Sequence, residues 1–447
     1  MDYVIEKQNN IPVVFDGDIC VLGGSCTGVF AAVRAARLGK KVCIVEKQNM
    51  FGGTATAGLV NVWHSIRDFD RKNQIIAGLT TEILDVMMKN KEAVLADDGS
   101  DSFFFNPVSM VKRLDELVLY EKIIKTFLHT FYAGAQLENE AVTTVFIQNK
   151  DGRGAIKAKY FIDATGDGDL MRDAGCEKYR HDFIQTPTTG FLMKGKPSFP
   201  LVKWAIEEHG EEFGLENDWG WFGDVPGVDG ISFRADNHII GYNLEKADDL
   251  TNAEIEGRKK AFAFEALLKK YVSPEYSIVN ICSTIGIRDT VHYKTKFKAN
   301  EMDLLTGKEY DDAILKSTYR IDIHHQDDKG ITFKDLDGKA VTIIGNYREI
   351  KNWNWREDAG ITGPCAQYYQ VPFAILVQKK IKNIIPAGRM INADEGSYGA
   401  LRVMVNANQM GEAAGVAASM GIDENKAIFE IDGMKVRKEL IKGGSAL

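Results

Sequence analysis

The sequence lacks the C-x-x-C spacing of a redox dithiol. It holds six cysteines, and no two of them are spaced as C-x-x-C. Without that spacing a disulfide-reductase mechanism is excluded. Cys20 and Cys43 lie in short apolar runs that we expect to form buried strands, where cysteine serves as a small apolar side chain. This cysteine usage is typical of a reducing compartment, and we expect a cytoplasmic location.

Long apolar runs and an excess of positive charge are missing as well. No run approaches the roughly eighteen apolar residues of a membrane-spanning helix, so we expect no membrane association. Residues 1–7 lack a basic segment followed by an apolar one, and we expect no signal peptide. The net charge of −8 argues against binding to nucleic acid or anionic lipid. With 447 residues, 45% of them hydrophobic, the chain has the size and composition of a multidomain globular enzyme.

Patterns that hold metal ions are also missing, and we predict no metal site. No helical H-x-x-x-H or pair of cysteines is present. One group of residues has the right side chains for a metal, but adjacent histidines on a strand point to opposite faces and rarely share an ion. We therefore interpret this group as a solvated loop. Its members are Asp322, His324, His325, Asp327 and Asp328.

A glycine-rich turn between two apolar runs is the strongest positive signal. Ile19–Leu22 predicts a buried strand, small residues over 29–38 predict a helix packed close to a sheet, and residues 41–46 predict a second strand ending at Glu46. A dinucleotide needs this order: backbone N–H groups and a helix N-terminus face the pyrophosphate, and a carboxylate holds the ribose hydroxyls. The residues of the turn are Gly23, Gly24, Ser25, Cys26, Thr27 and Gly28.

Two residues refine this interpretation. Ser25 stands where the dinucleotide motif has its middle glycine, and its hydroxyl could contact the pyrophosphate or cap the helix. Glu46 would repel a 2′-phosphate, so FAD or NAD is expected rather than NADP. A βαβ unit that binds no nucleotide is the alternative. An NAD-only dehydrogenase is another, and it predicts a colourless protein.

A second glycine-rich stretch follows Glu46 and favours FAD over NAD. The whole stretch resembles the E-K-x(n)-G-G-x-x-T-x-G segment of the FAD-dependent oxidoreductases of the glutathione-reductase type. The resemblance implies an α/β fold in which a Rossmann-type FAD-binding domain combines a parallel sheet with a β-meander. It also implies FAD as the cofactor. The residues expected to line the flavin nucleotide are Lys47, Gly52, Gly53, Thr54, Ala55 and Thr56.

Further segments extend the resemblance to the middle and the last part of the chain. The segment Ala164–Asp167 resembles the family's A-T-G-D strand end, and Ala387–Arg389 resembles its closing A-G-[RD] strand end. In the family a helix N-terminus then meets the flavin, and we expect it here at 399–402. Phe131, in a region predicted as strands, is a further candidate cofactor contact. The cofactor-binding residues implied by these segments are Ala164, Thr165, Gly166, Asp167, Gly388, Arg389, Ala400, Leu401 and Val403.

The remaining segments predict how the chain is organised. Residues 60–126 are expected to be mostly helical, with a helix beginning at Asn106-Pro107. Residues 129–158 predict a three-stranded meander, and 183–361 predict an inserted α+β domain with a mainly antiparallel sheet for the substrate. The FAD-binding domain is then discontinuous, over 1–182 and 362–447. The small-residue helix near 402–420 is expected to pack against the sheet or the first helix.

Three residues are candidates for catalysis. His64 follows the second glycine-rich stretch and could act near the flavin as an acid, a base or an orienting donor, or could be a structural histidine. Arg288 lies in a segment that resembles the family's G-I-R-[ED]. It could bind a carboxylate or form a salt bridge with Asp289. Arg402 could stabilise negative charge on the flavin or form a salt bridge elsewhere.

The function expected from these observations is an FAD-dependent oxidoreductase, of the dehydrogenase or reductase type, acting on an organic small molecule. The electron donor or acceptor is not indicated, and an assembly of identical subunits is compatible with the sequence. Two other classes remain open. One is a flavoprotein hydratase or isomerase with non-redox FAD, and the other is a flavin-binding protein without turnover.

Overall fold

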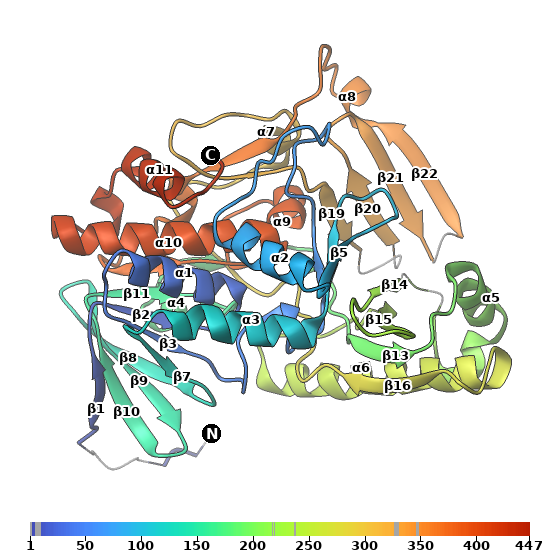
Figure 1. Cartoon of the computed structure of the whole chain (residues 1–447), viewed down its shortest axis with the longest axis horizontal. Helices are drawn as coiled ribbons and strands as arrows, with labels where there is room; N and C mark the ends of the chain where they lie inside the picture. The colour runs from blue at the N-terminus through green and yellow to red at the C-terminus, as the bar shows by residue number, and fades with distance from the viewer. Residues whose placement is uncertain are drawn as a thin grey trace.

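A five-stranded parallel sheet lies on the left of the molecule in Figure 1. The computed structural model describes residues 2–4, 10–216, 218, 220–236, 238–325, 330–345 and 348–447. The glycine-rich turn follows the central strand of the sheet, where a ligand is held at the carboxyl ends of the strands. The strands, in order across the sheet, are β24 (Ile384–Pro386), β11 (Tyr160–Asp163), β2 (Ile19–Leu22), β3 (Val42–Val45) and β7 (Ile124–Phe127).

Alternation along β2 explains why both faces of this sheet are covered. Ile19 and Val21 belong to a core shared with two helices, whereas Cys20 and Leu22 belong to a second core shared with an antiparallel meander. Successive side chains of a strand point to opposite faces, so an apolar run of four residues supplies both cores. The predicted buried strand and the predicted meander are confirmed. The meander consists of β8 (Phe131–Glu138), β9 (Ala141–Asn149) and β10 (Gly152–Lys157), and β1 (Val13–Asp16) pairs parallel to its edge.

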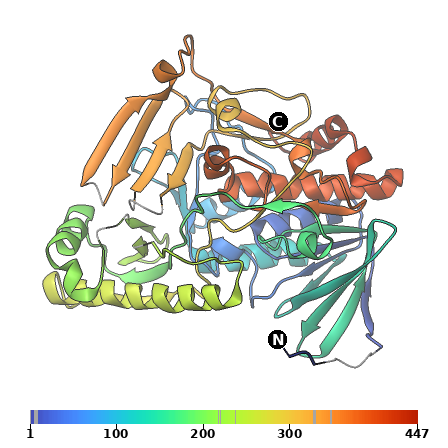
Figure 2. The same ribbon diagram turned by 180° about the vertical axis from the view of Figure 1, so that it is seen from behind.

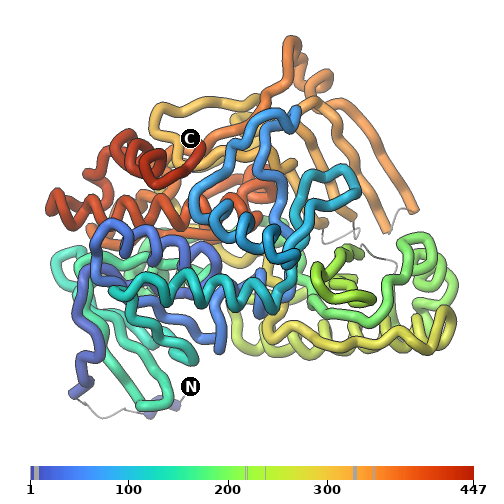
Figure 3. Tube along the Cα trace, in the orientation of Figure 1, coloured from blue at the N-terminus to red at the C-terminus, as the bar shows by residue number. Residues whose placement is uncertain are grey.

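Helices α1 (Cys26–Arg37) and α10 (Met404–Glu424) cover the other face of the sheet and pack directly on each other (Figures 1 and 3). Their contact depends on glycine. A Cβ atom at Gly411 would lie 2.2 Å from the Thr27 carbonyl oxygen, and one at Gly415 would lie 2.4 Å from the Ala31 carbonyl oxygen. The prediction that the small-residue face packs against the first helix is confirmed. Arg34 and Glu412 form a buried ion pair across the contact.

The segment over 60–126 is less helical than the sequence indicated. Helices α2 (Leu79–Lys89) and α3 (Pro107–Tyr120) are present, and Asn106 caps α3 with Pro107 in the first turn, as predicted. The same segment also forms a three-stranded antiparallel sheet. Aromatic residues from 103 to 105 pair with two other short segments, a long-range pairing that helix-period spacing does not reveal. Its strands are β4 (Val62–Trp63), β6 (Phe103–Phe105) and β5 (Ala93–Leu95).

Two four-stranded antiparallel sheets make up most of the region between β12 and β23, as Figure 2 shows from behind. The long helix α6 (Ala247–Tyr271) packs on the first, and the predicted strand near 190–193 is β13 of that sheet. The second sheet stands on the other side of the cavity described below. The first sheet contains β14 (Gly220–Asp224), β15 (Ile231–Asp236), β13 (Phe191–Lys194) and β16 (Ser277–Ile281), and the second contains β19 (Ile321–His324), β20 (Gly330–Lys334), β21 (Lys339–Ile344) and β22 (Glu349–Asn354).

Short elements connect these layers. Two two-stranded pairings join distant segments, and α9 lies directly before α10. Among the described residues, no helix has both the length and the apolar character needed to cross a membrane. The connecting elements are β12 (Lys178–Tyr179) with β17 (His292–Tyr293), β18 (Ala313–Ser317) with β23 (Tyr369–Pro372), α4 (Asp169–Asp173), α5 (Phe199–His209), α7 (Glu301–Leu305), α8 (Trp355–Asp358), α9 (Glu395–Leu401) and α11 (Gly433–Lys442).

Candidate functional site

A cavity of about 1370 Å³ begins at the carboxyl ends of β2 and β3 and extends to the β19–β22 sheet. Sites for a single small molecule usually occupy about 300–1,000 Å³, so this cavity has room for a dinucleotide and a second molecule. The glycine-rich turn lines one end, and a group of arginine, histidine and tyrosine side chains lines the other.

The glycine-rich turn has no space for side chains at two of its positions. Gly23 has φ +98°, and a Cβ atom there would lie 2.2 Å from the Ala164 carbonyl oxygen. A Cβ atom at Gly28 would lie 1.9 Å from the carbonyl oxygen of Gly23. Only glycine permits this close approach of the strand end to the helix N-terminus. Ser25 is the N-cap of α1, and its Oγ accepts from the Gly28 N–H at 3.5 Å, so this hydroxyl caps the helix.

Glu46 holds the backbone of the turn through its carboxylate. Its side chain is 6% exposed, one carboxylate oxygen accepts from the Gly24 N–H at 2.6 Å, and the other accepts from the Gln48 N–H at 2.7 Å. A carboxylate has about four lone-pair positions, so two remain for ligand hydroxyl groups. Glu46 therefore fixes the backbone and still faces the cavity.

The second glycine-rich stretch docks on the first. Ser25 and Gly52 form a parallel β-bridge, and the Gly52 N–H donates to the Gly24 carbonyl oxygen at 2.8 Å. Gly53 also packs against Ser25, because a Cβ atom at Gly53 would lie 3.0 Å from the Ser25 Cβ. The two stretches therefore form one continuous wall, although Ser25 and Gly52 lie 27 positions apart in the sequence.

Two further segments line the cavity near the glycine-rich turn: Ala164–Asp167 and the segment that ends in Arg389. Arg389 forms an ion pair with Asp167, and the Thr290 hydroxyl donates to the same Asp167 oxygen at 2.7 Å. Gly388 has φ +109°, and the atoms nearest to a Cβ there belong to the Thr27 side chain, 3.9 Å away. Its α-carbon therefore faces open space in the cavity.

The helix N-terminus lies four residues later than the sequence indicated. We expected it at 399–402, but Ala400 and Leu401 form the last turn of α9, and α10 begins at Met404 with Val403 as its N-cap. Gly399 is where α9 crosses β19, since a Cβ there would lie 2.4 Å from the Asp322 carbonyl oxygen. Gly399 therefore serves this helix–strand packing. The α10 N-terminus itself lines the cavity through Val403 and Met404.

Most of the residues predicted from the sequence line this one cavity. Those that do not are packed behind its wall or, as with Gly24, bonded to a residue that does. The predicted residues that line the cavity are Gly23, Ser25, Cys26, Thr27, Glu46, Lys47, Gly52, Gly53, Thr54, His64, Phe131, Ala164, Thr165, Gly166, Asp167, Arg288, Gly388, Arg389, Arg402 and Val403. The predicted residues that do not are Gly24, Gly28, Ala55, Thr56, Ala400 and Leu401.

The polar end of the cavity contains the three candidate catalytic residues. The His64 ring lies against the Tyr319 ring, with 4.0 Å between centroids. Burial lowers the pKa of His64 to about 3, so the imidazole is neutral at physiological pH. Arg402 donates from Nε to Gln185 at 2.9 Å and forms an ion pair with Asp322 at 2.9 Å.

Arg288 differs from Arg402 in having no carboxylate partner among the described residues. Its Nη1 donates to the Thr186 carbonyl oxygen at 2.6 Å. The salt bridge with Asp289 that we considered is not formed, because Asp289 contacts His181 and His292 instead. Burial and the nearby Arg402 lower the pKa of Arg288 to about 10, which leaves it a cation at neutral pH.

Asp322 and His324 are buried in the cavity wall, so their interpretation as part of a solvated loop is wrong. They lie on β19, and His325 follows it; Asp327 and Asp328 lie outside the described residues. The Tyr319 hydroxyl donates to Asp322 at 2.6 Å. Burial would raise the pKa of Asp322, but Arg402 and His324 outweigh it and hold that pKa well below its usual range.

His324 also connects the cavity to a second buried histidine. Its Nδ1 lies 2.7 Å from Nε2 of His238, and Nδ1 of His238 lies 2.9 Å from a carboxylate oxygen of Asp218. A carboxylate only accepts, so Nδ1 of His238 carries the hydrogen that faces Asp218, and Nε2 of His324 lies 3.3 Å from Asp322. Sequence spacing could not reveal this connection, since 86 residues separate the two histidines.

We expect acid sensitivity from His64. Its folded-state pKa of about 3 lies below the ordinary value of 6.5, so between these values the unfolded chain binds a proton that the folded chain does not. Stability present above pH 6.5 is therefore lost as the pH falls toward 3. In His64→Gln the melting temperature should fall less between pH 7 and pH 5 than in the unmodified protein. Equal falls, measured by calorimetry, would contradict this; His209→Gln, on a surface helix, is the control.

The cavity fits an FAD molecule by its size and by its unused polar atoms. Three residues that line it have a buried polar atom without a hydrogen-bond partner among the described residues: Arg389 (Nε), Asn408 (Oδ1) and Asp322 (Oδ1). The open α-carbon of Gly388 and the free N-terminus of α1 provide room and backbone donors for a pyrophosphate. Phe131, 57% exposed at the edge of the cavity, offers an aromatic face.

Comparisons with known proteins agree with this geometry. Residues 18–440 match a family model described as FAD dependent oxidoreductase. A soluble pyridine nucleotide transhydrogenase of Chromohalobacter salexigens is 28% identical over 159 residues, covering 34% of this chain and 31% of that protein. A mitochondrial dihydrolipoyl dehydrogenase of Schizosaccharomyces pombe is 27% identical over 162 residues, covering 33% of this chain and 28% of that protein. The matched segment thus spans about a third of these relatives.

Solved structures show a looser likeness. A geranylgeranyl bacteriochlorophyll reductase-like protein from Thermoplasma acidophilum has a TM-score of 0.47 and 12% identity, with 96% of this chain and 83% of that chain covered. A myxobacterial chondrochloren halogenase has a TM-score of 0.44 and 11% identity, with 95% and 78% covered.

Proposed function

The chain belongs to the family of FAD-dependent oxidoreductases, and from this premise we propose that it transfers two electrons between FAD and a small organic molecule that carries a carboxylate. The observation that carries the carboxylate is Arg288, a cavity-lining cation with no carboxylate partner among the described residues. A planar guanidinium matches a carboxylate with two parallel hydrogen bonds. We propose a dehydrogenase or reductase rather than a hydroxylase.

The residues at the glycine-rich end are suited to hold the nucleotide part of FAD. Glu46 has lone pairs left for ribose hydroxyls, and the N-terminus of α1 with the Gly23–Gly28 turn offers N–H groups to the pyrophosphate. Phe131 offers a surface on which an adenine can stack. FAD supplies the two-electron chemistry when bound.

The other end is suited to the substrate. Arg288 binds the carboxylate, while Arg402, neutralised in part by Asp322, lies beside the N-terminus of α10 and stabilises negative charge. Neutral His64 is able to accept a proton at a ring nitrogen or to orient a substrate by donating from one. The catalytic roles that we propose therefore belong to His64, Arg288 and Arg402.

An anaerobic screen tests this function. We expect small carboxylic acids, such as 2-hydroxy acids and amino acids, to bleach the flavin absorbance near 450 nm, or the matching unsaturated or 2-oxo acids to reoxidise the dithionite-reduced protein. Primary amides of the same molecules form the control, since they keep the size and lose the charge. If amides react as fast as acids, the carboxylate proposal is wrong, although the oxidoreductase assignment stands.

Three further expectations remain proposals. The six free cysteines, five of them buried, support a cytoplasmic location. We retain the division into an FAD-binding part (1–182 and 362–447) and a substrate part (183–361), and a separate electron donor or acceptor. An assembly of identical subunits can be tested by analytical ultracentrifugation.

A further inference from the structure

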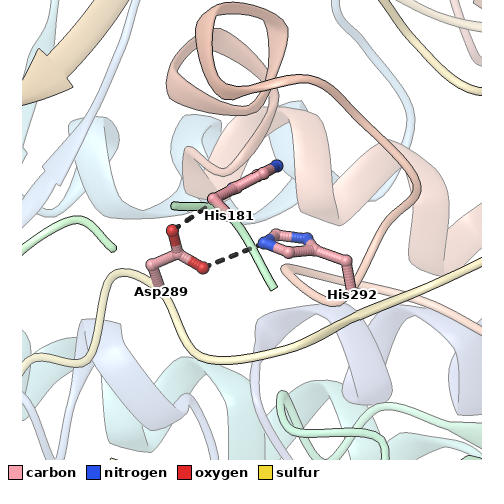
Figure 4. Close-up of side chains that lie close together, drawn as sticks. All are labelled: His181, Asp289 and His292. Carbon is pink, nitrogen blue, oxygen red and sulfur yellow. Dashed lines mark hydrogen bonds and ion pairs between the residues drawn. The ribbon is translucent and has the colours of Figure 1, made fainter. Parts of the chain in front are cut away.

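We propose that His181, Asp289 and His292, which lie close together in Figure 4, bind a divalent transition-metal ion of the zinc type. We expected no metal site from the sequence. No spacing motif marks this one, because 108 residues separate His181 from Asp289. The fold brings the two segments together, because β12 pairs with β17. His181 follows β12 closely in the chain, and His292 belongs to β17.

The three side chains have the spacing of a metal site. His181 Nδ1 lies 3.5 Å from one oxygen of Asp289, and His292 Nε2 lies 3.0 Å from the other. One ligand atom from each residue lies within 4.8 Å of the others. Zinc bonds of about 2.0–2.1 Å at tetrahedral angles put ligand atoms about 3.3 Å apart, close to both N–O distances.

The far side of each ring determines which nitrogens carry protons. His181 Nε2 lies 2.9 Å from the Ala393 carbonyl oxygen, and His292 Nδ1 lies 2.9 Å from the Ile391 carbonyl oxygen. A carbonyl oxygen accepts only, so both of these nitrogens must carry hydrogen. In the neutral rings, the nitrogens that face Asp289 then present lone pairs to a carboxylate.

A cation between the three groups resolves this conflict. Lone pairs of two imidazoles and one carboxylate are metal ligands, and metal-binding histidines typically donate their other N–H to a backbone carbonyl, as both rings do here. The alternative is an extra proton on each ring. It would make the His181–Asp289 contact a charge-assisted hydrogen bond, and 3.5 Å is long for such a bond, which is usually about 2.7–2.9 Å.

The chemistry of the ligands favours zinc over magnesium or calcium. Imidazole nitrogen suits zinc and its neighbours, whereas magnesium and calcium prefer oxygen. The side chains of Asp289 and His292 are 1% exposed, and that of His181 is 6% exposed. His181 is therefore the ligand nearest to solvent, and the three side chains leave a fourth tetrahedral position.

The site adjoins the residue to which we assign substrate binding. Asp289 follows Arg288 directly, and the Tyr398 hydroxyl donates to the Arg288 carbonyl oxygen at 2.5 Å. The His292 ring meets the Tyr398 ring edge to face at 4.6 Å. A metal at this site would join the segments before β13, at β17 and before α9, and would hold the backbone of Arg288 in place.

Metal content tests the proposal without reference to activity. The FAD-loaded protein is treated with a chelator, incubated with zinc sulfate at a slight molar excess, passed through a desalting column and analysed by mass spectrometry for zinc. We expect about one zinc per chain and a higher melting temperature than in the chelated protein. In Asp289→Asn and His181→Gln we expect at least a tenfold lower zinc content and a melting temperature that does not respond to zinc.

His238→Gln is the matched control, because it removes a buried histidine from another cluster and should leave zinc retention unchanged. His181→Gln is the variant least able to disturb folding, because His181 lies at the edge of the site. An unmodified protein that retains less than a tenth of an equivalent of zinc overturns the proposal. Equal retention by the unmodified protein and both variants overturns it as well.

Discussion

Replacing Arg288 by alanine is expected to slow reduction of the flavin by its substrate by about a hundredfold, while the FAD content per chain stays the same. The guanidinium is a cation in the cavity wall with no carboxylate partner among the described residues, so its hydrogen-bonding capacity remains for a ligand. Hydrogen bonds to a charged group contribute about 1.5–3 kcal/mol, and each 1.4 kcal/mol corresponds to a factor of ten. Stopped-flow absorbance near 450 nm under anaerobic conditions measures the rate.

Two variants make this result specific. Arg288→Lys keeps the charge but loses the planar pair of donors, so an intermediate rate is expected. Arg258→Ala removes an arginine that pairs with Glu254 on the surface of α6 and should leave the rate unchanged. Loss of FAD together with activity in Arg288→Ala would instead assign this residue a structural role.

Replacing Glu46 by arginine is expected to give a protein that is purified without most of its FAD. The change removes the two carboxylate oxygens that accept from the Gly24 N–H at 2.6 Å and from the Gln48 N–H at 2.7 Å. Leaving a buried donor without a partner costs about 1–3 kcal/mol for each group. The change also puts a cation where ribose hydroxyls need an acceptor. FAD released by heat and measured by fluorescence should fall at least tenfold.

The control for this variant is Glu138→Arg, which makes the same charge change on an exposed strand of the meander and should retain FAD. Glu46→Gln keeps one oxygen acceptor and should show an intermediate FAD content. Full FAD occupancy in Glu46→Arg would remove Glu46 from the ribose site.

Local features of the fold could be predicted from the sequence because short-range forces determine them. The β2 run, the turn and α1 follow from burial, glycine conformation and the Ser25 cap, all within 20 residues of one another. Asn106 and Pro107 begin α3 for the same local reasons. The resemblance to known flavoproteins added the distant segments that line the same cavity.

The polar end of the cavity could not be predicted in the same way. Asp322 and His324 have polar neighbours in the sequence, which indicated an exposed loop. They are buried because Arg402 pairs with Asp322 and His238 contacts His324. The end of α9 at Leu401 depends on its crossing of β19 at Gly399, whereas the sequence indicated a helix N-terminus at 399–402. Each error involves a partner that lies many residues away.

The order of strands in the parallel sheet has a consequence for synthesis of the protein. β24 pairs with β11, and α10 packs on α1, although β24 begins at Ile384 and β11 ends at Asp163. A nascent chain that has left the ribosome only as far as the β19–β22 sheet therefore has an open sheet edge beside β11 and an uncovered α1. Such long-range pairings form slowly and expose apolar surface meanwhile. We expect FAD to be captured only after α10 has been released, late in translation.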